Sequence, residues 1–261
     1  MSEAFYERSG KGSFVATELT RGPWDPGSQH AGPPSALLGR ELELLESSEG
    51  FQVGRVVFEI LRPVPIGAVR VESRVLRPGR NVQLVEAKLS GEAGELVRAT
   101  AWLLRVSELD LPDETTAVDA PPQGPEEGWT PEFFATGQDV GYHTGMEWKA
   151  VAGAFVEPGP ATVWMRMRQP LVEGEEPSPL QRALVAADVG NGISAVLDPR
   201  RHLFINVDLT VHLERMPEGE WVCVDAVTRP QPSGIGTAES VLSDERGRIG
   251  RAAQSLLIAQ R

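Results

Sequence analysis

The sequence contains one cysteine, four histidines and no run of about eighteen apolar residues, the length that a membrane-spanning helix needs. A single cysteine, Cys223, excludes an intrachain disulfide and any cysteine-rich zinc or iron–sulfur site. The histidines lack metal-ligand spacing, and no phosphate loop, dinucleotide-binding glycine fingerprint or nucleophile elbow is present. The N-terminal residues have no apolar segment of the kind that a secretory signal requires. We therefore expect a cytoplasmic protein with no membrane span, no metal and no cofactor.

Basic residues are also scarce: 25 Lys and Arg stand against 37 Asp and Glu, for a formal net charge of −12. Such a charge repels nucleic acid, so a nucleic-acid-binding function is not expected. Residues 111–139 hold seven acids, five prolines and no Lys or Arg, a composition typical of a linker. We predict that they join a first unit, residues 1–110, to a second unit, residues 140–261. Aromatic residues near the linker's end are expected to hold it against a folded surface: Trp129, Phe133 and Phe134.

An internal repeat relates the two predicted units. Residues 94–104 match residues 247–257 position by position, and the same shift of 153 places pairs Arg62 with Arg215. Beyond that pair, both copies have a turn with Pro and Gly and then residues that alternate as in a β-strand. Matched order over roughly fifty residues indicates an internal duplication of about domain size.

Each copy is predicted to contain one main helix and several strands. Prolines open the helices, at 33–34 before residues 35–45 and at 177–179 before residues 180–188. The predicted strands lie near 14–20, 55–61, 69–76, 82–89 and 96–106 in the first copy and near 162–167, 204–213, 221–227, 237–242 and 249–258 in the second. One helix wrapped by an antiparallel sheet is an α+β architecture, and two such units would pack as a pseudo-dimer.

Asp188 is the polar residue that most clearly breaks the hydrophobic pattern. It follows Leu180 and Leu184 at helical spacing, so its carboxylate lies on the apolar stripe of the predicted helix. A buried carboxylate needs a partner or a raised pKa, and no Lys or Arg lies one turn away on that face. We interpret Asp188 as functional; the structural alternative is a carboxylate that serves the helix C-terminal turn or pairs with a distant arginine.

Two further polar residues replace apolar residues of the first copy. Gln254 stands where the first copy has Ala101, and Asn206 stands where it has Val53. Each is also consistent with a structural role, as a buried glutamine bonded to backbone or as an edge residue facing water. The first copy instead has His30-Ala31-Gly32 before its helix, where free N–H groups bind developing negative charge. One copy thus supplies the acid, and the other supplies the helix N-terminus.

The chain resembles the hotdog-fold acyl-CoA thioesterases, and among them the double-hotdog acyl-CoA thioesterase II type, over most of its length outside the linker. His30-Ala31-Gly32 resembles the His-Gly-Gly helix start of that superfamily, with Ala31 in place of the first glycine. Residues 61–63 and 76–81 look like its first-copy strand signatures. The resemblance implies a double hotdog, with a long helix wrapped by an antiparallel sheet in each of two tandem units. It also implies that such chains associate further into homo-oligomers.

In the thioesterase II type, an Asp, a Thr and a Gln hold the attacking water, and these positions fall on Asp188, Asn206 and Gln254. The resemblance therefore implies hydrolysis of a fatty acyl-CoA, a reaction of lipid metabolism, by water that Asp188 activates. The N–H of Gly32 and its neighbours Ala31 and His30 would face the thioester oxygen. Arginines on loops would bind the CoA phosphates: Arg77, Arg80, Arg200, Arg201 and Arg229.

Two alternatives remain open at this point. A hotdog hydratase or dehydratase carries a histidine near its Asp, and Ser194 stands where such a histidine would be expected. A non-catalytic acyl-CoA-binding protein is the other alternative, because Asn206 departs from the Thr of the thioesterase II type. The preferred acyl chain length and the oligomeric state do not follow from the sequence.

Overall fold

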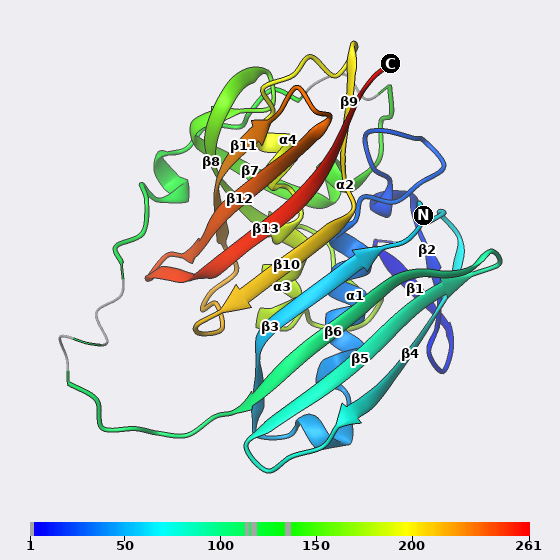
Figure 1. The fold of residues 1–261 in the computed structure, drawn as a ribbon, viewed down its shortest axis with the longest axis vertical. Helices are drawn as coiled ribbons and strands as arrows, with labels where there is room; N and C mark the ends of the chain where they lie inside the picture. The colour runs from blue at the N-terminus through cyan, green and yellow to red at the C-terminus, as the bar shows by residue number, and fades with distance from the viewer. Residues whose placement is uncertain (1–2, 113–114, 116–118, 134–136) are drawn as a thin grey trace.

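The computed structural model describes residues 3–112, 115, 119–133 and 137–261 (Figure 1). The first half contains a hairpin, a helix and four further strands: β1 (Tyr6–Gly10), β2 (Ser13–Ala16), α1 (Gly32–Glu43), β3 (Phe51–Ile60), β4 (Ala68–Arg77), β5 (Val82–Gly91) and β6 (Gly94–Arg105). The second half repeats this order with two additional short helices and one divided strand: α2 (Tyr142–Gly145), β7 (Met146–Ala154), β8 (Glu157–Met167), α3 (Pro179–Ala187), α4 (Gly190–Ile193), β9 (His202–Asn206), β10 (Asp208–Leu213), β11 (Val222–Pro230), β12 (Ile235–Asp244) and β13 (Gly247–Gln260). Single 3-10 turns lie at Glu18–Thr20, Glu46–Ser48 and Pro125–Glu127.

The described strands form one antiparallel sheet in which the two halves follow the same order from opposite ends. The order is β1-β2-β4-β5-β6-β3-β10-β13-β12-β11-β8-β7, and β9 and β10 pair with successive stretches of β13. Strands that the repeat makes equivalent, such as β5 and β12 or β6 and β13, occupy equivalent places about the central pair of β3 and β10. An internal duplication produces this arrangement, which has a pseudo-twofold axis at its centre.

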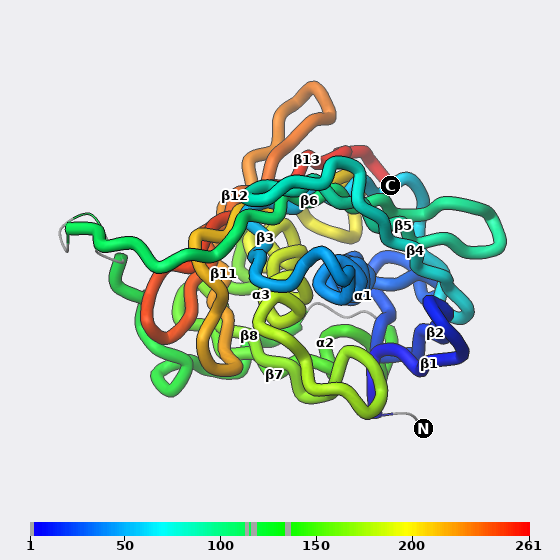
Figure 2. Tube along the Cα trace, turned by 90° about the horizontal axis from the view of Figure 1, so that it is seen from below, coloured from blue at the N-terminus to red at the C-terminus, as the bar shows by residue number. Residues whose placement is uncertain are grey.

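The two main helices lie against each other inside the curve of the sheet (Figure 2). α1 has 12 residues and carries Pro33 and Pro34 in its first turn, where a missing N–H is tolerated. α3 has nine residues and begins after Ser178, whose hydroxyl caps the helix by accepting from Gln181 N. The α+β class and the large antiparallel sheet are as predicted, but both helices are short, so the long helix expected in each unit is not found.

The hydrophobic core fills the space between these helices and the inner face of the sheet. Leu37, Leu38 and Leu42 of α1 and Leu184 of α3 are completely buried. The helices run in opposite directions, so the end of α3 meets the beginning of α1. Gly32 marks that contact, because a Cβ atom there would lie only 2.5 Å from the carbonyl oxygen of Val185. This packing brings the C-terminal end of one helix to the N–H groups of the other.

The predicted linker, residues 111–139, is described only in part, because residues 113–114, 116–118 and 134–136, including Phe134, lie outside the described residues. Its later part packs on the second half, as predicted. The Phe133 ring lies 4.6 Å from that of Phe155 and 5.3 Å from that of Trp148. Trp129 contributes through its backbone, which pairs with Ala150, and not through its half-exposed side chain. The unit boundaries proposed from the sequence stay predictions.

Candidate active site

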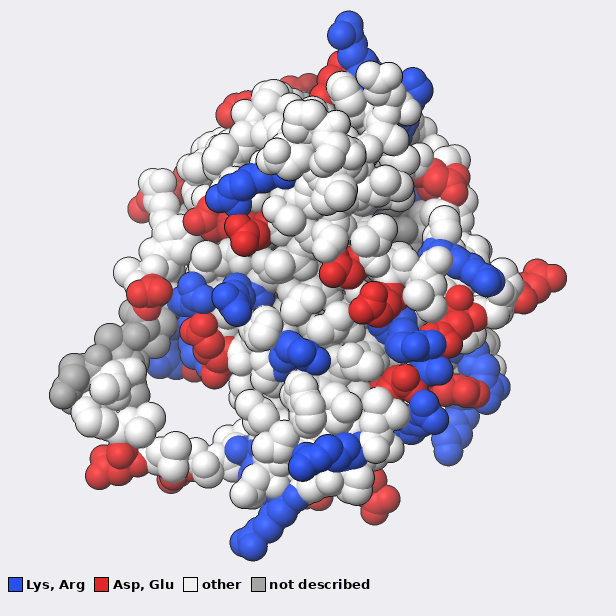
Figure 3. All heavy atoms as spheres, viewed as in Figure 1, with Lys and Arg blue, Asp and Glu red and all other residues white. Residues whose placement is uncertain are grey.

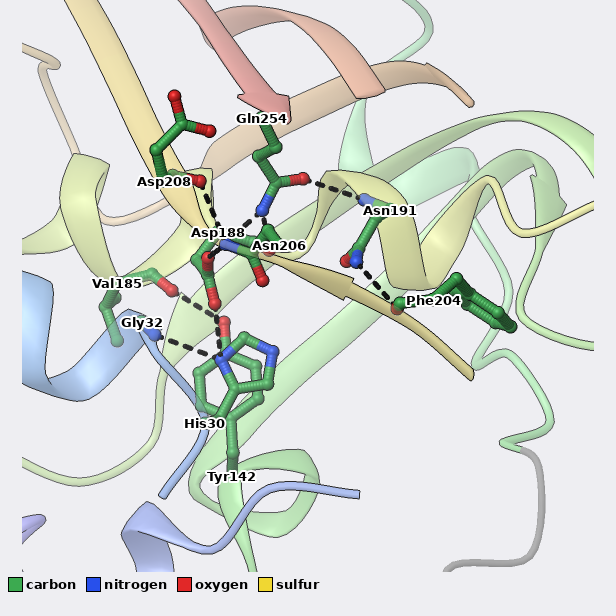
Figure 4. A network of polar contacts seen from close by, with 10 residues as sticks. All are labelled: His30, Gly32, Tyr142, Val185, Asp188, Asn191, Phe204, Asn206, Asp208 and Gln254. Carbon is green, nitrogen blue, oxygen red and sulfur yellow. Dashed lines mark hydrogen bonds and ion pairs between the residues drawn. The ribbon is translucent and has the colours of Figure 1, made fainter. Parts of the chain in front are cut away.

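Asp188 lies at the C-cap of α3 and is 3% exposed. Its carboxylate oxygen Oδ1 accepts from Asn206 Nδ2 at 2.8 Å and from Gln254 Nε2 at 3.1 Å (Figure 4). Gln254 Nε2 also donates to the Asp188 carbonyl oxygen at 2.9 Å. The structure therefore brings together the three polar residues that interrupt the apolar pattern of the second half.

A break between β9 and β10 turns Asn206 toward this carboxylate. The sequence predicted a continuous strand over residues 204–213, but Val207 separates two strands there. Beyond the break, the Asp208 carboxylate accepts from Ser255 N of β13 at 2.6 Å. Asn206 Nδ2 makes a second hydrogen bond to the Asp208 carbonyl oxygen at 3.2 Å. The break thus fixes the orientation of the Asn206 amide, so that its nitrogen donates both to the Asp188 carboxylate and to the Asp208 carbonyl oxygen.

Gln254 links the carboxylate to the short helix α4. Its Oε1 accepts from Asn191 N at 3.1 Å while its Nε2 donates to Asp188, so the amide orientation is set at both ends. Glycine at position 190 leaves room for this approach, because a Cβ atom there would lie 2.6 Å from Ser240 Oγ and 3.3 Å from Gln254 Oε1, and those side chains would have to shift. Asn191 was not predicted as a site residue, although the Gly-Asn-Gly sequence after a helix is a signal for such a tight turn.

His30 reaches the same carboxylate from the first half. Its Nδ1 lies 3.2 Å from Asp188 Oδ2 and accepts from Gly32 N at 3.1 Å. The ring stacks on Tyr142, with 3.9 Å between ring centroids and an interplanar angle of 12°. Tyr142 in turn donates to the carbonyl oxygen of Val185 at 2.6 Å, at the end of α3. Sequence patterns did not reveal Tyr142, because nothing in its neighbourhood indicates contact with a histidine of the other half.

Burial sets the protonation states at this site. Burial raises the pKa of Asp188 to about 7, although hydrogen bonds from Asn206 and Gln254 and from the N–H groups of Ala31 and Gly32 lower it. Burial also lowers the pKa of His30 to about 3, so the imidazole is neutral at physiological pH. The result is a carboxyl group that changes its charge near neutral pH beside a neutral histidine.

A cavity of about 450 Å³, here called the wide cavity, opens between the two halves at Asp188. The first half contributes residues between 22 and 31 and residues 60–64 to its walls, and the second half contributes Asp188, Asn191, residue 203 and residues 205–207. His30, Ala31 and Asn206 also line it. Asn206, Asp188 and the start of α1 therefore face one space that is large enough for a small-molecule substrate.

The five predicted CoA-binding arginines do not line the wide cavity. Arg77 and Arg80 lie at the turn between β4 and β5, and Arg229 donates to Glu239 at 2.6 Å. Arg200 and Arg201 lie on the turn that leads into β9, close in sequence to Leu203 of the cavity wall. The arginine on that wall is Arg62. On the face shown in Figure 3, basic and acidic side chains are interspersed over the sheet.

Two other kinds of site have no candidate in the described part of the chain. No helix there is long and apolar enough to cross a membrane. No three His, Cys, Asp or Glu side chains among those residues gather as potential metal ligands.

The sequence matches two family profiles in succession. Residues 20–104 match the acyl-CoA thioesterase N-terminal domain, and residues 113–258 match the acyl-CoA thioesterase C-terminal domain. The chain therefore belongs to the acyl-CoA thioesterase family, as the resemblance predicted, and is a thioester hydrolase. No curated protein gives a significant match to the sequence.

Solved structures share the fold across nearly the whole chain. A protein from Thermobifida fusca described as a thioesterase II superposes with a TM-score of 0.74 at 16% identity, covering 97% of this chain and 95% of that one. A hot dog fold protein of unknown function from Alicyclobacillus acidocaldarius gives 0.69 at 13% identity, covering 98% and 95%. Acyl-CoA thioesterase II from Mycobacterium marinum gives 0.66 at 10% identity, covering 98% and 96%. These likenesses establish a hotdog fold.

Proposed function

We propose that this chain hydrolyses acyl-CoA thioesters to a free acid and CoA, using a water molecule that Asp188 activates. The observation that carries the proposal is a buried carboxylate, held by two side-chain amides and a helix N-terminus, at the wall of a cavity of about 450 Å³. Family membership supports thioester hydrolysis as the reaction, and the surroundings of Asp188 support its role as the general base.

In this proposal, Asp188 takes a proton from water. Asn206 and Gln254 hold its Oδ1, which leaves Oδ2 to act as the base. As the proton transfers, the water oxygen bonds to the thioester carbonyl carbon, and the carbonyl oxygen becomes an oxyanion. The tetrahedral intermediate then expels CoA as a thiolate, which takes up the proton, so the products are a carboxylic acid and a free thiol. A base with a pKa of about 7 is effective at neutral pH, because its ionised form is both populated and basic.

In this proposal, His30 lies beside the base and stabilises the negative charge that forms on the thioester carbonyl oxygen. Its Nδ1 accepts from Gly32 N, so the single proton of the neutral ring is on Nε2. Nδ1 lies 3.2 Å from Asp188 Oδ2, so this contact holds the ring directly beside the base. We assign oxyanion stabilisation to the Nε2–H of His30, which lines the wide cavity, in place of the Gly32 N–H expected from the sequence.

The wide cavity suits the pantetheine arm of CoA. Ser28 and Asp25 give its wall oxygen atoms that can accept from the amides of that arm, and Leu61 and Val207 give it an apolar rim. Arg62 adds a cation for the CoA phosphates. Among the arginines predicted for that role, we favour Arg200 and Arg201, which lead into β9 and the cavity wall. The homo-oligomer and the cytoplasmic location expected from the sequence stay predictions.

Release of free thiol from acyl-CoA, measured with a thiol-reactive dye, tests this function. The purified chain should turn over at least one acyl-CoA, Asp188→Asn should lose at least about a thousandfold in kcat, and Asp198→Asn, on an exposed turn, should match the parent. Full activity in Asp188→Asn would contradict the assigned base. Acyl-CoA binding without thiol release would favour the non-catalytic alternative. Loss of the double bond of a 2-enoyl-CoA without thiol release would favour the hydratase alternative, which uses an Asp and His pair such as Asp188 and His30.

A further inference from the structure

A second, smaller cavity opens beside the catalytic groups. Aromatic rings dominate its walls: Trp24, His30, Phe133, Tyr142, Trp148 and Phe155. Its volume is about 50 Å³. We call it the aromatic pocket. It shares Pro23, Trp24, His30 and Asn191 with the wide cavity, so the two spaces meet next to the Asp188 carboxylate.

The two spaces match the two sides of a thioester. A carbonyl carbon within reach of water on Asp188 carries sulfur and the pantetheine arm on one side and the acyl group on the other. The pantetheine arm needs room and hydrogen-bond partners for its amides, and the wide cavity is much the larger space and has the more polar walls. The walls of the aromatic pocket are mostly apolar, although Arg21, His143 and Asn191 also line it. A hydrocarbon acyl group needs no hydrogen-bond partners, and it gains from contact with aromatic rings. The aromatic pocket is therefore the space that fits the acyl group.

The size of the aromatic pocket restricts that group. An apolar cavity of about 150 Å³ is known to bind benzene, and the aromatic pocket has about a third of that volume. Resting on the proposed function, we propose that the aromatic pocket receives the acyl group and selects short acyl chains of about two to four carbons. Longer chains would have to displace rings that are packed against one another.

Phe133 and Phe155 form the part of the wall that sets this limit. Their ring centroids lie 4.6 Å apart, and each ring also packs on Trp148, at 5.3 Å from Phe133 and 5.4 Å from Phe155. Phe133 comes from the segment that joins the two halves, and Phe155 comes from the turn between β7 and β8. Neither side chain contacts Asp188, Asn206 or Gln254 through any hydrogen bond or ring contact described for those residues, so both can be shortened without removing the catalytic groups.

A chain-length series tests the proposal with acetyl-, butyryl-, octanoyl- and palmitoyl-CoA. We expect kcat/KM for butyryl-CoA to exceed that for palmitoyl-CoA by at least about tenfold, because methylenes that do not fit must displace packed rings, and overfilling a packed site costs roughly tenfold or more. Phe155→Ala and Phe133→Ala should each raise the octanoyl to butyryl ratio by about tenfold or more. Trp129→Ala, on the same segment as Phe133 but outside both cavities, should leave the ratio unchanged.

Equal or higher efficiency with palmitoyl-CoA would overturn the proposed selection and leave the hydrolase function intact. An unchanged ratio in both phenylalanine variants would place the acyl group elsewhere. Binding of S-ethyl-, S-butyl- and S-hexadecyl-CoA, thioethers that cannot be hydrolysed, separates this proposal from the reaction itself. Tighter binding of S-butyl-CoA than of S-hexadecyl-CoA or CoA would support the pocket even if no thioester were hydrolysed; no such preference, together with no hydrolysis, would refute it.

Discussion

The sharpest test of the site is that removing the charge of Asp188 should abolish activity and at the same time stabilise the protein above neutral pH. The carboxyl group is 3% exposed, and burial raises its pKa from 3.8 to about 7. The folded chain therefore resists ionisation of Asp188, whereas the unfolded chain does not. Stability that is fully present below pH 3.8 is lost as the pH rises, until the folded carboxyl group ionises near pH 7.

The size of the effect follows from that difference in pKa. About three pH units at about 1.4 kcal/mol each give roughly 4 kcal/mol as the full loss, and about 2 kcal/mol of it falls between pH 5.5 and pH 8.5. Asp188→Asn removes this loss, because an amide carries no charge at any of these pH values. The Asn oxygen can accept from Asn206 and Gln254 in place of Oδ1. The cost of losing the hydrogen bonds from the N–H groups of Ala31 and Gly32 does not depend on pH, so it cancels from a comparison of two pH values.

Urea denaturation of both proteins at pH 5.5 and pH 8.5 measures the effect. The free energy of unfolding of Asp188→Asn minus that of the parent should be about 2 kcal/mol larger at pH 8.5 than at pH 5.5, so the variant gains relative stability as the pH rises. Asp198→Asn, which alters an exposed carboxylate, should show no such change between the two conditions. A difference between parent and Asp188→Asn that is the same at both pH values would refute the argument that burial makes Asp188 a base near neutral pH.

Three further substitutions test the groups around Asp188. Asn206→Thr should retain activity within about tenfold, because a hydroxyl can replace the 2.8 Å donor to Oδ1; a loss of about a thousandfold in steady-state kcat would contradict this. Gln254→Met should lower kcat about a hundredfold and move the rising limb of the pH–rate profile to higher pH, since a donor that lowers the Asp188 pKa is lost. Gly32→Ala should destabilise the chain by about 1–3 kcal/mol in urea unfolding, because its Cβ would lie 2.5 Å from the Val185 carbonyl oxygen, which is backbone and cannot move to another rotamer.

The residues that sequence analysis identified share a physical signature. Asp188 interrupts an apolar helix stripe, and Gln254 and Asn206 are polar where the first half is apolar, so a buried polar side chain was visible in the pattern alone. The duplication also made the strand order predictable, because each half has to form the same sheet. Sequence analysis of this kind detects a polar residue that lies on the otherwise apolar face of a single helix or strand.

The site residues that sequence analysis missed come from other parts of the fold. Tyr142 stacks on His30 across the two halves, and Asn191 meets Gln254 through a backbone N–H, which carries no side-chain signal. The position at which the sequence analysis expected a hydratase histidine, Ser194, is also not the one that contacts Asp188. Ser194 is buried against Gly190 and Thr228, whereas the histidine beside Asp188 comes from the first half. Sequence neighbours of a residue do not reveal the contacts made across a pseudo-twofold axis.

The same axis predicts where catalysis should be absent. It relates the wide cavity to a second cleft of about 310 Å³, where the end of α1 meets the beginning of α3. Glu43 lines that cleft, and the Ser178 hydroxyl at the N-terminus of α3 donates to its carboxylate at 2.7 Å. The positions equivalent to Asn206 and Gln254 hold the buried apolar residues Val53 and Ala101, and the amide that bonds the Glu43 carboxylate comes instead from Gln181 of α3.

A carboxylate at a helix junction is therefore common to both clefts, and the two amides and His30 distinguish the catalytic one. Glu43→Gln should leave acyl-CoA hydrolysis within about twofold of the parent, because the proposed reaction uses no group of the second cleft. Thiol release measured beside Asp188→Asn checks this expectation. If the two variants lost activity to a similar degree, the clefts would act together, and the amides would not be what makes one of them an active site.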